Sequence, residues 1–428
     1  MEAKMQFARL DSERIYMFEN EKVEERLILV AAFTGTEEAA NESLDELEEL
    51  VETAGAVAVG RVTQARDSIH PGTYVGKGKL EDIKTAILAF DATGIVCDDE
   101  LSPAQIRNLE QELDTKIMDR TCVILDIFAG RAQTAEGKIQ VELAQHRYML
   151  ARLVGMRTSL SRLGGGIGTR GPGEKKLEMD RRLIKNRISH LKKELAEVQK
   201  NREVNRQQRK RNQMPVVAIV GYTNAGKSTL LNQLTGAGVL EEDKLFATLD
   251  PTTRSLQLEN KQEVLITDTV GFIRKLPHHL IDAFRGTLEE AKYADILLHV
   301  VDGTNPQVES QMETVYHTLK NLKVEGKPVI TAFNKVDKDV NDFYQFDNHA
   351  DKVLAISART GQGLADLKSL IAELLRENLQ LLERVIPYEE AHILQYIRKY
   401  GTLLEEEYRD NGIYVKAYLP EEWYQKCM

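Results

Sequence analysis

Cysteine, tryptophan and long apolar runs are scarce in this sequence of 428 residues. The three cysteines, Cys97, Cys122 and Cys427, form no C-x-x-C pair, which argues against a disulfide framework and a structural metal site. No uninterrupted apolar stretch approaches about 18 residues, the length of a membrane-spanning helix, and the N-terminus is too charged for a signal peptide. We therefore expect a cytoplasmic protein without stable membrane insertion.

An excess of positive charge is also absent, since the formal net charge is −10. Taken alone, this balance argues against a nucleic-acid partner. The average hides one exception, because residues 175–211 contain 14 lysines and arginines against 5 acidic residues. A hydrophobic content of 42% and a charged content of 29% are ordinary for globular proteins. At this length we expect two to four domains with their own cores.

The basic segment has apolar residues at helical spacing, which predicts an amphipathic helix. The stretch 134–155 has a similar pattern, so the two are expected to form a helical hairpin. Between them, residues 163–174 include six glycines and a proline, a composition that cannot form a core. A basic arm with a glycine-rich tip suits insertion into a phosphate-lined cavity. A solvated helix face and a membrane-surface helix remain alternatives.

The segment 221–228 reads G-Y-T-N-A-G-K-S and follows the apolar run 215–220. A strand that ends in G-x-x-x-x-G-K-S is typical of a P-loop, whose backbone N–H groups surround the phosphates of a nucleotide. Lys227 is expected to reach the β- and γ-phosphates, and the Ser228 hydroxyl to bind Mg²⁺. The predicted nucleotide contacts are Gly221, Tyr222, Thr223, Asn224, Ala225, Gly226, Lys227 and Ser228.

Three further motifs follow in the order that a GTPase requires, each at the end of an apolar run. Asp268, Thr269, Val270 and Gly271 match D-x-x-G, in which Asp268 holds Mg²⁺ through water and the Gly271 N–H meets the γ-phosphate. The N-K-x-D motif is formed by Asn334, Lys335, Val336 and Asp337. The Asp337 carboxylate can accept two hydrogen bonds from guanine, and adenine lacks those donors. The loop of Ile356, Ser357 and Ala358 is expected to read guanine O6.

The segment 246–254 offers three threonines for switch I, the loop that completes the Mg²⁺ shell. Its pattern F-x-T-L-x-P resembles the Obg-like branch of translation-factor GTPases, which selects Thr248; Thr252 and Thr253 remain alternatives. With this choice, the metal ligands are Ser228 and Thr248. The catalytic residues are Lys227, Thr248 and Gly271. The predicted contacts from this loop are Phe246, Ala247, Thr248, Leu249 and Asp250.

Two positions bear on the mechanism. Phe272 follows D-T-V-G, where Ras-type GTPases place a glutamine that orients the attacking water, and phenylalanine cannot form that hydrogen bond. We therefore predict slow basal hydrolysis, with the water oriented by a partner or by another residue of the chain. In the P-loop, Asn224 resembles an asparagine that helps other GTPases hold K⁺. The alternative for Asn224 is a local hydrogen bond that stabilises the loop.

Alternating strand and helix patterns predict α/β folding on both sides of the arm. The predicted fold is an N-terminal α/β domain with a basic helical arm, a central Ras-like P-loop GTPase domain and a small C-terminal α+β domain. In the C-terminal part, Asp410-Asn-Gly412 predicts a hairpin turn. The predicted domain bounds are 1–132, 133–213 for the arm and linker, 214–380 and 381–428.

Together the P-loop, the segments 246–250 and 268–272, the loop 168–174 and the segment 126–132 resemble HflX-type GTPases over essentially the full length. The resemblance implies binding to the large ribosomal subunit and dissociation of stalled or idle ribosomes. It also implies that the arm approaches rRNA near the peptidyl-transferase region. Some relatives bind ATP through the N-terminal domain, but this sequence shows no adenine-specific motif. We expect a monomer. A regulatory GTPase with protein partners only and a nucleotide-driven RNA remodelling factor remain alternatives.

Overall fold

The computed structural model describes residues 24–163, 172–211, 214–236, 245–246, 249–258, 262–277, 290–338, 343–377 and 379–428. These residues form two compact units, of which the first ends at Ile124 and the second begins at Leu125. Among the helices within these ranges, none is both long and apolar enough to cross a membrane.

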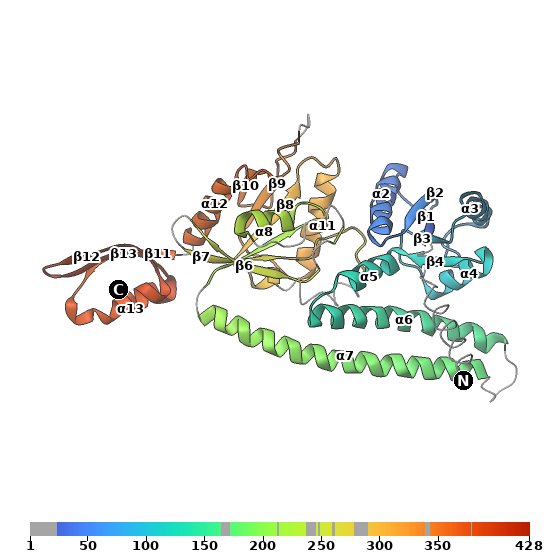
Figure 1. Ribbon diagram of the computed structural model, residues 1–428, viewed down its shortest axis with the longest axis horizontal. Helices are drawn as coiled ribbons and strands as arrows, with labels where there is room; N and C mark the ends of the chain where they lie inside the picture. Colours follow the sequence, from blue (N-terminus) through green and yellow to red (C-terminus); the bar gives the residue numbers. More distant parts are fainter. Residues whose placement is uncertain are drawn as a thin grey trace, which may run out of the picture. The chain divides into compact units, whose positions relative to one another are not determined.

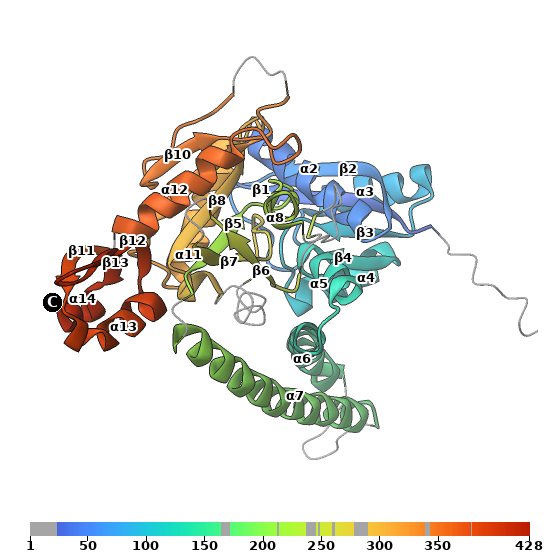
Figure 2. The same ribbon diagram turned by 60° about the vertical axis from the view of Figure 1, so that its left-hand side comes forward.

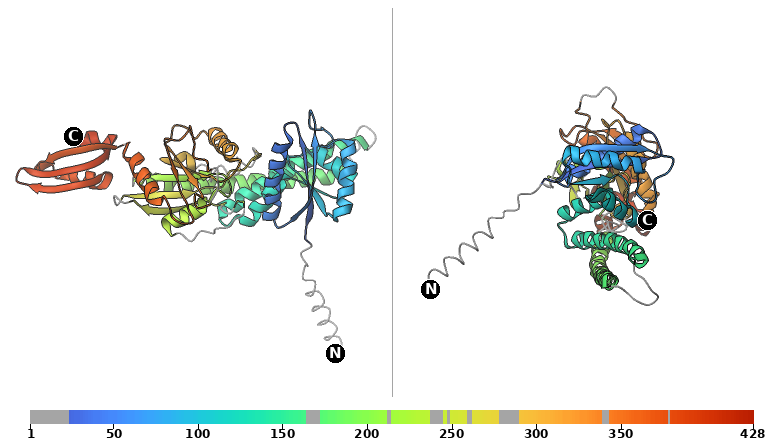
Figure 3. Two further views of the ribbon diagram at one scale, coloured as in Figure 1. Left: turned by 90° about the horizontal axis from the view of Figure 1, so that it is seen from above. Right: turned by 90° about the vertical axis from the view of Figure 1, so that its right-hand side faces the viewer.

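The first unit is built on a parallel sheet with the strand order β2-β1-β3-β4. Helices cover both faces of this sheet, whose strands are blue in the left view of Figure 3. This confirms the alternation expected from the sequence. The elements are β1 (Arg26–Phe33), α2 (Glu37–Thr53), β2 (Val57–Ala65), α3 (Lys77–Phe90), β3 (Gly94–Cys97), α4 (Pro103–Leu113) and β4 (Lys116–Asp119).

Helix α5 (Arg120–Arg131) directly follows β4 and was not predicted. It is followed by two long helices, α6 (Ala135–Leu163) and α7 (Pro172–Arg211), which lie side by side in Figures 1 and 2. Leu143, Ile188 and Leu191 are buried between them, as the helical spacing requires. The expected hairpin is therefore confirmed, and we call α6 and α7 the helical arm. Residues 164–171 of the glycine-rich loop lie outside the described residues.

Residues 216–377, which we call the G domain, contain a six-stranded sheet in the order β10-β9-β8-β5-β7-β6. All neighbouring strands are parallel except β6 and β7, which form an antiparallel hairpin. The elements are β5 (Val216–Gly221), α8 (Lys227–Thr235), β6 (Thr252–Gln257), β7 (Glu263–Asp268), β8 (Ile296–Asp302), α11 (Val308–Asn321), β9 (Val329–Asn334), β10 (Lys352–Ala355) and α12 (Leu364–Glu377).

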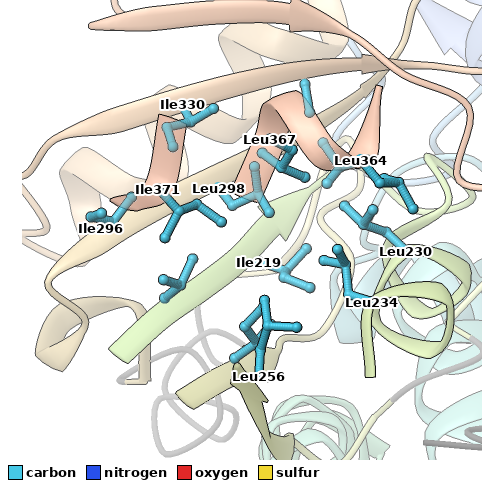
Figure 4. Close-up of a cluster of buried hydrophobic side chains, with 14 of the residues drawn as sticks. Ile219, Leu230, Leu234, Leu256, Ile296, Leu298, Ile330, Leu364, Leu367 and Ile371 are labelled. Carbon is cyan, nitrogen blue, oxygen red and sulfur yellow. The ribbon is translucent and has the colours of Figure 1, made fainter. Parts of the chain in front are cut away.

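One large cluster of buried side chains lies between this sheet and helices α8 and α12 (Figure 4). Ile219 and Leu298 of the central strands meet Leu230 of α8 and Leu367 of α12, and all four are fully buried. A smaller cluster under α11 covers the other face. Because the central strands are covered on both faces, they are continuously apolar, and the ends of the strands are where polar chemistry gathers.

The C-terminal residues form an antiparallel sheet in the order β11-β13-β12, with two helices packed on one face. The turn at Asp410-Asn-Gly412 joins β12 and β13 as predicted. Strand β11 begins at Leu379, where its first residues pair with the end of β13. The elements are β11 (Leu379–Ile386), η1 (Tyr388–Glu390), α13 (His392–Tyr400), β12 (Thr402–Arg409), β13 (Gly412–Pro420) and α14 (Glu421–Cys427).

Candidate nucleotide-binding site

The P-loop motif lies where the sequence places it, between the end of β5 and the start of α8. Gly226 adopts φ +95°, and a side chain there would overlap the amide nitrogen of Asn334. Asn224 also has a left-handed conformation, with φ +59° and an exposed side chain. The loop therefore takes the conformation that turns successive N–H groups toward one point, at the N-terminus of a helix.

Lys227 is buried, and its Nζ donates a hydrogen bond of 2.6 Å to the carbonyl oxygen of Tyr222. Burial lowers the pKa of Lys227 to about 8, and the charge of Asp268 only partly opposes this. A buried ammonium group has much to gain from phosphate oxygens, because they replace the water that it has lost. This arrangement favours the binding of an anion beside the loop.

Ser228 and Asp268 come together from two different elements at the same edge of the sheet. Ser228 Oγ donates to Asp268 Oδ2 over 2.9 Å, and the carboxylate is completely buried. Oxygen ligands of this kind are those that Mg²⁺ prefers. The two residues fit the predicted metal site, with the hydroxyl as a direct ligand and the carboxylate behind it.

The D-x-x-G segment is held tightly against the P-loop. Thr269 Oγ1 donates to the carbonyl oxygen of Ile219 over 2.7 Å, and Val270 is buried. A Cβ added to Gly271 would lie 2.9 Å from Lys227 Nζ. Only a glycine leaves the lysine and the Gly271 N–H open toward the same space, which is where the γ-phosphate is predicted to lie.

Phe272 packs into the core and is 1% exposed. Its N–H donates to the Gly221 carbonyl over 3.1 Å, and its carbonyl accepts from the Thr223 N–H over 2.8 Å. Tyr222 adds a third link, because its hydroxyl accepts from the Arg274 N–H over 2.9 Å. The ring of Phe272 is thus part of the packing, and the role of Tyr222 in holding this segment was not apparent from the motif.

Asn334 joins the base-reading loops to the P-loop. Its side-chain Nδ2 donates to the carbonyl oxygen of Ala225 over 2.9 Å, and its Oδ1 accepts from the Ala358 N–H over 2.8 Å. Ile356 and Val336 complete the contact, since the Val336 N–H donates to the Ile356 carbonyl over 3.2 Å. The structure therefore brings together the residues predicted from three separate motifs.

Asp337 is exposed, and Ser357 Oγ donates to its Oδ1 over 2.6 Å. This hydrogen bond lowers the pKa of the Asp337 carboxyl. The residue is therefore an anion with one oxygen held and the other available to a base. Lys335 has φ +72° and forms an ion pair of 2.6 Å with Asp302. Asp302 was missed by the sequence analysis, although an acidic residue at the end of β8 was a usable signal.

Switch I is only partly described, because Ala247 and Thr248 lie outside the described residues. Phe246 and Leu249 are buried, and Asp250 is directed to the start of helix α6. The two alternative threonines lie in β6, where Thr252 pairs with Asp268 and Thr253 Oγ1 lies 2.9 Å from Thr267 Oγ1.

Family models match three consecutive parts of the chain. A model described as GTP-binding GTPase N-terminal matches residues 41–129, and one described as GTP-binding GTPase Middle Region matches residues 131–209. A third, described as 50S ribosome-binding GTPase, matches residues 216–335.

Curated relatives are similar over nearly the whole chain. GTPase HflX of Lacrimispora saccharolytica is 65% identical over 406 residues, which are 95% of this chain and 96% of the relative. GTPase HflX of Escherichia coli K12 is 40% identical over 418 residues, 96% of this chain and 97% of the relative. Among solved structures, a GTP-binding protein from Sulfolobus solfataricus in complex with GDP has 26% identity and a TM-score of 0.43, covering 82% of this chain and 99% of its own.

Proposed function

Because this chain belongs to the HflX family of GTPases, we propose that it binds the large ribosomal subunit in its GTP form and dissociates stalled or idle ribosomes. The chain is a GTPase that converts GTP to GDP and phosphate. Its place of action is the cytoplasm, where ribosomes are found, and it acts as a monomer.

The hydrolytic site is assembled from residues of the G domain. Ser228 and Thr248 would hold Mg²⁺, which would supply positive charge to the phosphates of the nucleotide. Lys227 and the Gly271 N–H contact the γ-phosphate. Asp337 accepts hydrogen bonds from guanine. Support comes from the 2.9 Å contact between Ser228 and Asp268 and from the burial of Lys227.

Hydrolysis by the free protein is slow. Phe272 has no hydrogen-bonding group, and its ring is buried in the core of the G domain. The attacking water is then oriented by a partner, for which the ribosomal subunit is the candidate. A basal turnover of ~1 s⁻¹, the low end of the range for kinases, would contradict this part of the proposal.

The proposal includes a potassium ion that binds beside Asn224 and accelerates GTP hydrolysis. Asn224 is exposed at the tip of the P-loop, with φ +59°, so its amide oxygen is accessible to an ion. Such an ion would supply positive charge where an arginine finger acts in other GTPases. Hydrolysis should be faster in K⁺ than in Na⁺ at equal ionic strength, and equal rates would exclude this role.

The helical arm is the observation that carries ribosome binding. Helix α7 has 40 residues, so it extends about 60 Å. Arg182, Lys185, Lys192 and Lys193 are exposed along it, and Leu183 is 61% exposed beside them. Exposed basic and apolar side chains together suit a cavity lined by rRNA better than open solvent. The family description of residues 216–335 as a 50S ribosome-binding GTPase supports the same partner.

GTP controls this binding through the switch segments. The γ-phosphate orders switch I and the D-x-x-G segment, and its loss on hydrolysis releases them. Co-sedimentation with 50S and 70S particles in a non-hydrolysable GTP analogue and in GDP tests the proposal directly. Binding should require the analogue, and 70S particles should separate into subunits.

A charge-matched pair of variants isolates the arm. Arg182→Ala with Lys185→Ala removes two charges near its glycine-rich end, and Lys320→Ala with Lys323→Ala removes two exposed charges of the G domain. The arm variant should reduce the slope of log affinity against log salt by about 1 to 2, because fewer phosphates are contacted. The control pair should leave it unchanged.

Two results would favour the alternative functions. If the arm variant binds 50S particles like the wild type, partners contacted by other surfaces become the better explanation. If ATP hydrolysis survives Lys227→Ala, an RNA remodelling factor driven by the N-terminal unit becomes the better explanation. Binding of ATP to that unit stays a prediction.

A further inference from the structure

Asp250 of switch I binds the start of the helical arm. Its Oδ2 accepts hydrogen bonds from the N–H groups of Gln133 and Thr134, both over 2.9 Å. Its Oδ1 accepts from the Thr134 hydroxyl. One carboxylate therefore receives three hydrogen bonds from two adjacent residues that are more than 110 positions away in the sequence.

This contact has the chemistry of a helix cap. Thr134 precedes helix α6, and its Oγ1 accepts from the Gly137 N–H over 2.9 Å, as an N-cap residue does. The N–H groups at a helix start have no partner within the helix, and the helix dipole places partial positive charge there. The Asp250 carboxylate places a negative charge at that position. It therefore caps the N-terminus of α6 from switch I, in addition to the cap formed by Thr134.

An aromatic contact joins the same two segments. Phe246 is 2% exposed with φ +55°, and its ring meets that of Phe128 in α5 edge to face, with centroids 4.7 Å apart. Arg202 of α7 adds a link between helices, 3.1 Å from Glu136 and 3.9 Å from Glu290. Switch I is thus fixed at Phe246 and at Asp250 by residues outside the G domain.

These attachments bracket the predicted magnesium ligand. Thr248 lies two residues after Phe246 and two residues before Asp250, and two residues span at most about 7 Å. On the far side, Thr252 pairs with Asp268. The described positions on both sides of Thr248 are therefore attached, Phe246 and Asp250 to residues outside the G domain and Thr252 to β7.

We propose that Asp250 is a positioning residue for switch I, and that its capping of α6 lets the arm preorganise the loop for GTP. The inference rests on the proposed role of Thr248 at the metal. Holding both ends of a loop reduces the conformational entropy that is lost when the loop orders on a ligand. By linkage, bound GTP must in turn stabilise the capped start of α6.

The first test measures affinity for a non-hydrolysable GTP analogue and for GDP, with Mg²⁺, in the full-length protein. Asp250→Ala should lower the affinity for the analogue about 5- to 30-fold and the affinity for GDP less than about twofold. The reason is that only GTP requires switch I to be ordered. Asp250→Asn keeps an oxygen that accepts from the two N–H groups, and it should recover part of the loss. Equal weakening of both nucleotides, or none, would overturn the proposal.

A substitution in the arm tests the same contact without altering switch I. A methyl group at Gly137 would overlap Asp250 Oδ1 and would lie 3.2 Å from its Cγ. Gly137→Ala should therefore displace the carboxylate, although alanine favours helix formation. Gly130→Ala is the matched control, because a Cβ at this glycine of α5 meets nothing within 4 Å. Gly137→Ala should reproduce the loss for the analogue, and Gly130→Ala should not.

Amide hydrogen exchange separates coupling from a local folding defect. In the wild type, exchange at Gln133 and Thr134 should be slower with the analogue than with GDP, and Asp250→Ala should abolish the difference. An unchanged difference in the variant would overturn the proposal. These measurements use no ribosomes, so they remain decisive if the protein fails to bind 50S particles; if the wild type does not prefer GTP to ATP, the proposed function itself fails.

Discussion

The chain contains two largely parallel sheets whose strand ends use charged residues in opposite ways. In the first unit, Arg120 is 1% exposed and forms ion pairs with Asp98 at 2.8 Å and with Glu46 at 2.5 Å. In the G domain, Lys227 is also buried, and in the described part of the chain its ammonium group donates to a backbone carbonyl, that of Tyr222. The charge of Arg120 is neutralised by carboxylates of the protein. The charge of Lys227 is placed where an anion can bind.

The difference shows that a parallel sheet determines where polar groups gather, and that the local sequence decides what they do. Strand ends of both sheets carry aspartates. Asp119 accepts from the Leu101 and Cys122 N–H groups, so it serves the backbone. Asp268 receives the Ser228 hydroxyl, a group with an affinity for metal ions. Open α/β sheets commonly bind ligands at the carboxyl ends of their strands, so the fold by itself would predict a ligand site on both sheets.

Removing the buried arginine should have the largest effect. Arg120→Ala leaves the Asp98 carboxylate without its cation in a buried place, and we expect a loss of about 3–5 kcal/mol in the free energy of unfolding. Urea denaturation measures it. Arg61→Ala is the control, because this arginine also binds two carboxylates, Asp45 and Glu48, but is 35% exposed; its loss should stay below about 1 kcal/mol. Similar losses for both would contradict the comparison.

Removing the buried lysine should have the opposite profile. Lys227→Ala should weaken GTP binding by about 1.5–3 kcal/mol, which is the strength of hydrogen bonds to a charged group. Titration calorimetry measures this loss of binding free energy. The free protein should not lose stability, because burial already disfavours the ammonium form. A variant that unfolds more easily than the wild type would show that Lys227 is a structural residue like Arg120.

Replacing Asp337, which is predicted to bind the base, should reduce GTP binding by an amount similar to or smaller than that for Lys227→Ala. Asp337→Asn replaces one acceptor by an N–H donor, so GTP should bind about 1–3 kcal/mol more weakly. Xanthosine triphosphate presents an oxygen where guanine has its amino group. The Asp337→Asn variant should therefore bind this nucleotide more tightly than the wild type does. Competition binding of the two nucleotides measures the exchange. An unchanged ratio would mean that guanine is read elsewhere.

The pH dependence of binding gives the smallest expected effect. The pKa of Lys227 is about 8 in the free protein, and bound phosphate raises it because phosphate favours the charged form. Below pH 8 the lysine is already protonated, and above it GTP binding must take up a proton. From pH 7.5 to 9.0 the affinity should fall by up to about tenfold, or ~1.4 kcal/mol. Calorimetry in two buffers counts the protons, and Lys227→Arg should abolish the uptake.

Local motifs predicted where the P-loop and the base-reading segment lie in the fold, because each carries its own geometry. The P-loop and the N-K-x-D motif need only a strand end and a turn, and Asn334 then meets Ala225 as the fold closes. The Arg120 network and the Asp250 cap could not be predicted in the same way. Each joins residues separated by tens of positions, and no spacing within one segment reveals such a partner.

Element bounds show the same limit. Strand β6 begins at Thr252, inside the segment 246–254 that was expected to form switch I, because Thr252 and Thr253 pair with the end of β7. Their polar side chains gave no strand pattern of their own, so tertiary pairing decided their conformation. Helix α5 was missed for a related reason, since the residues that fold onto it come from other parts of the chain.

The length of α7 makes the arm a lever. A helix of 40 residues spans about 60 Å, so a tilt of only about 5° at its base would swing its far end by about 5 Å. Because Leu191 of α7 packs against α6, the two helices would have to tilt together for the far end to move in this way.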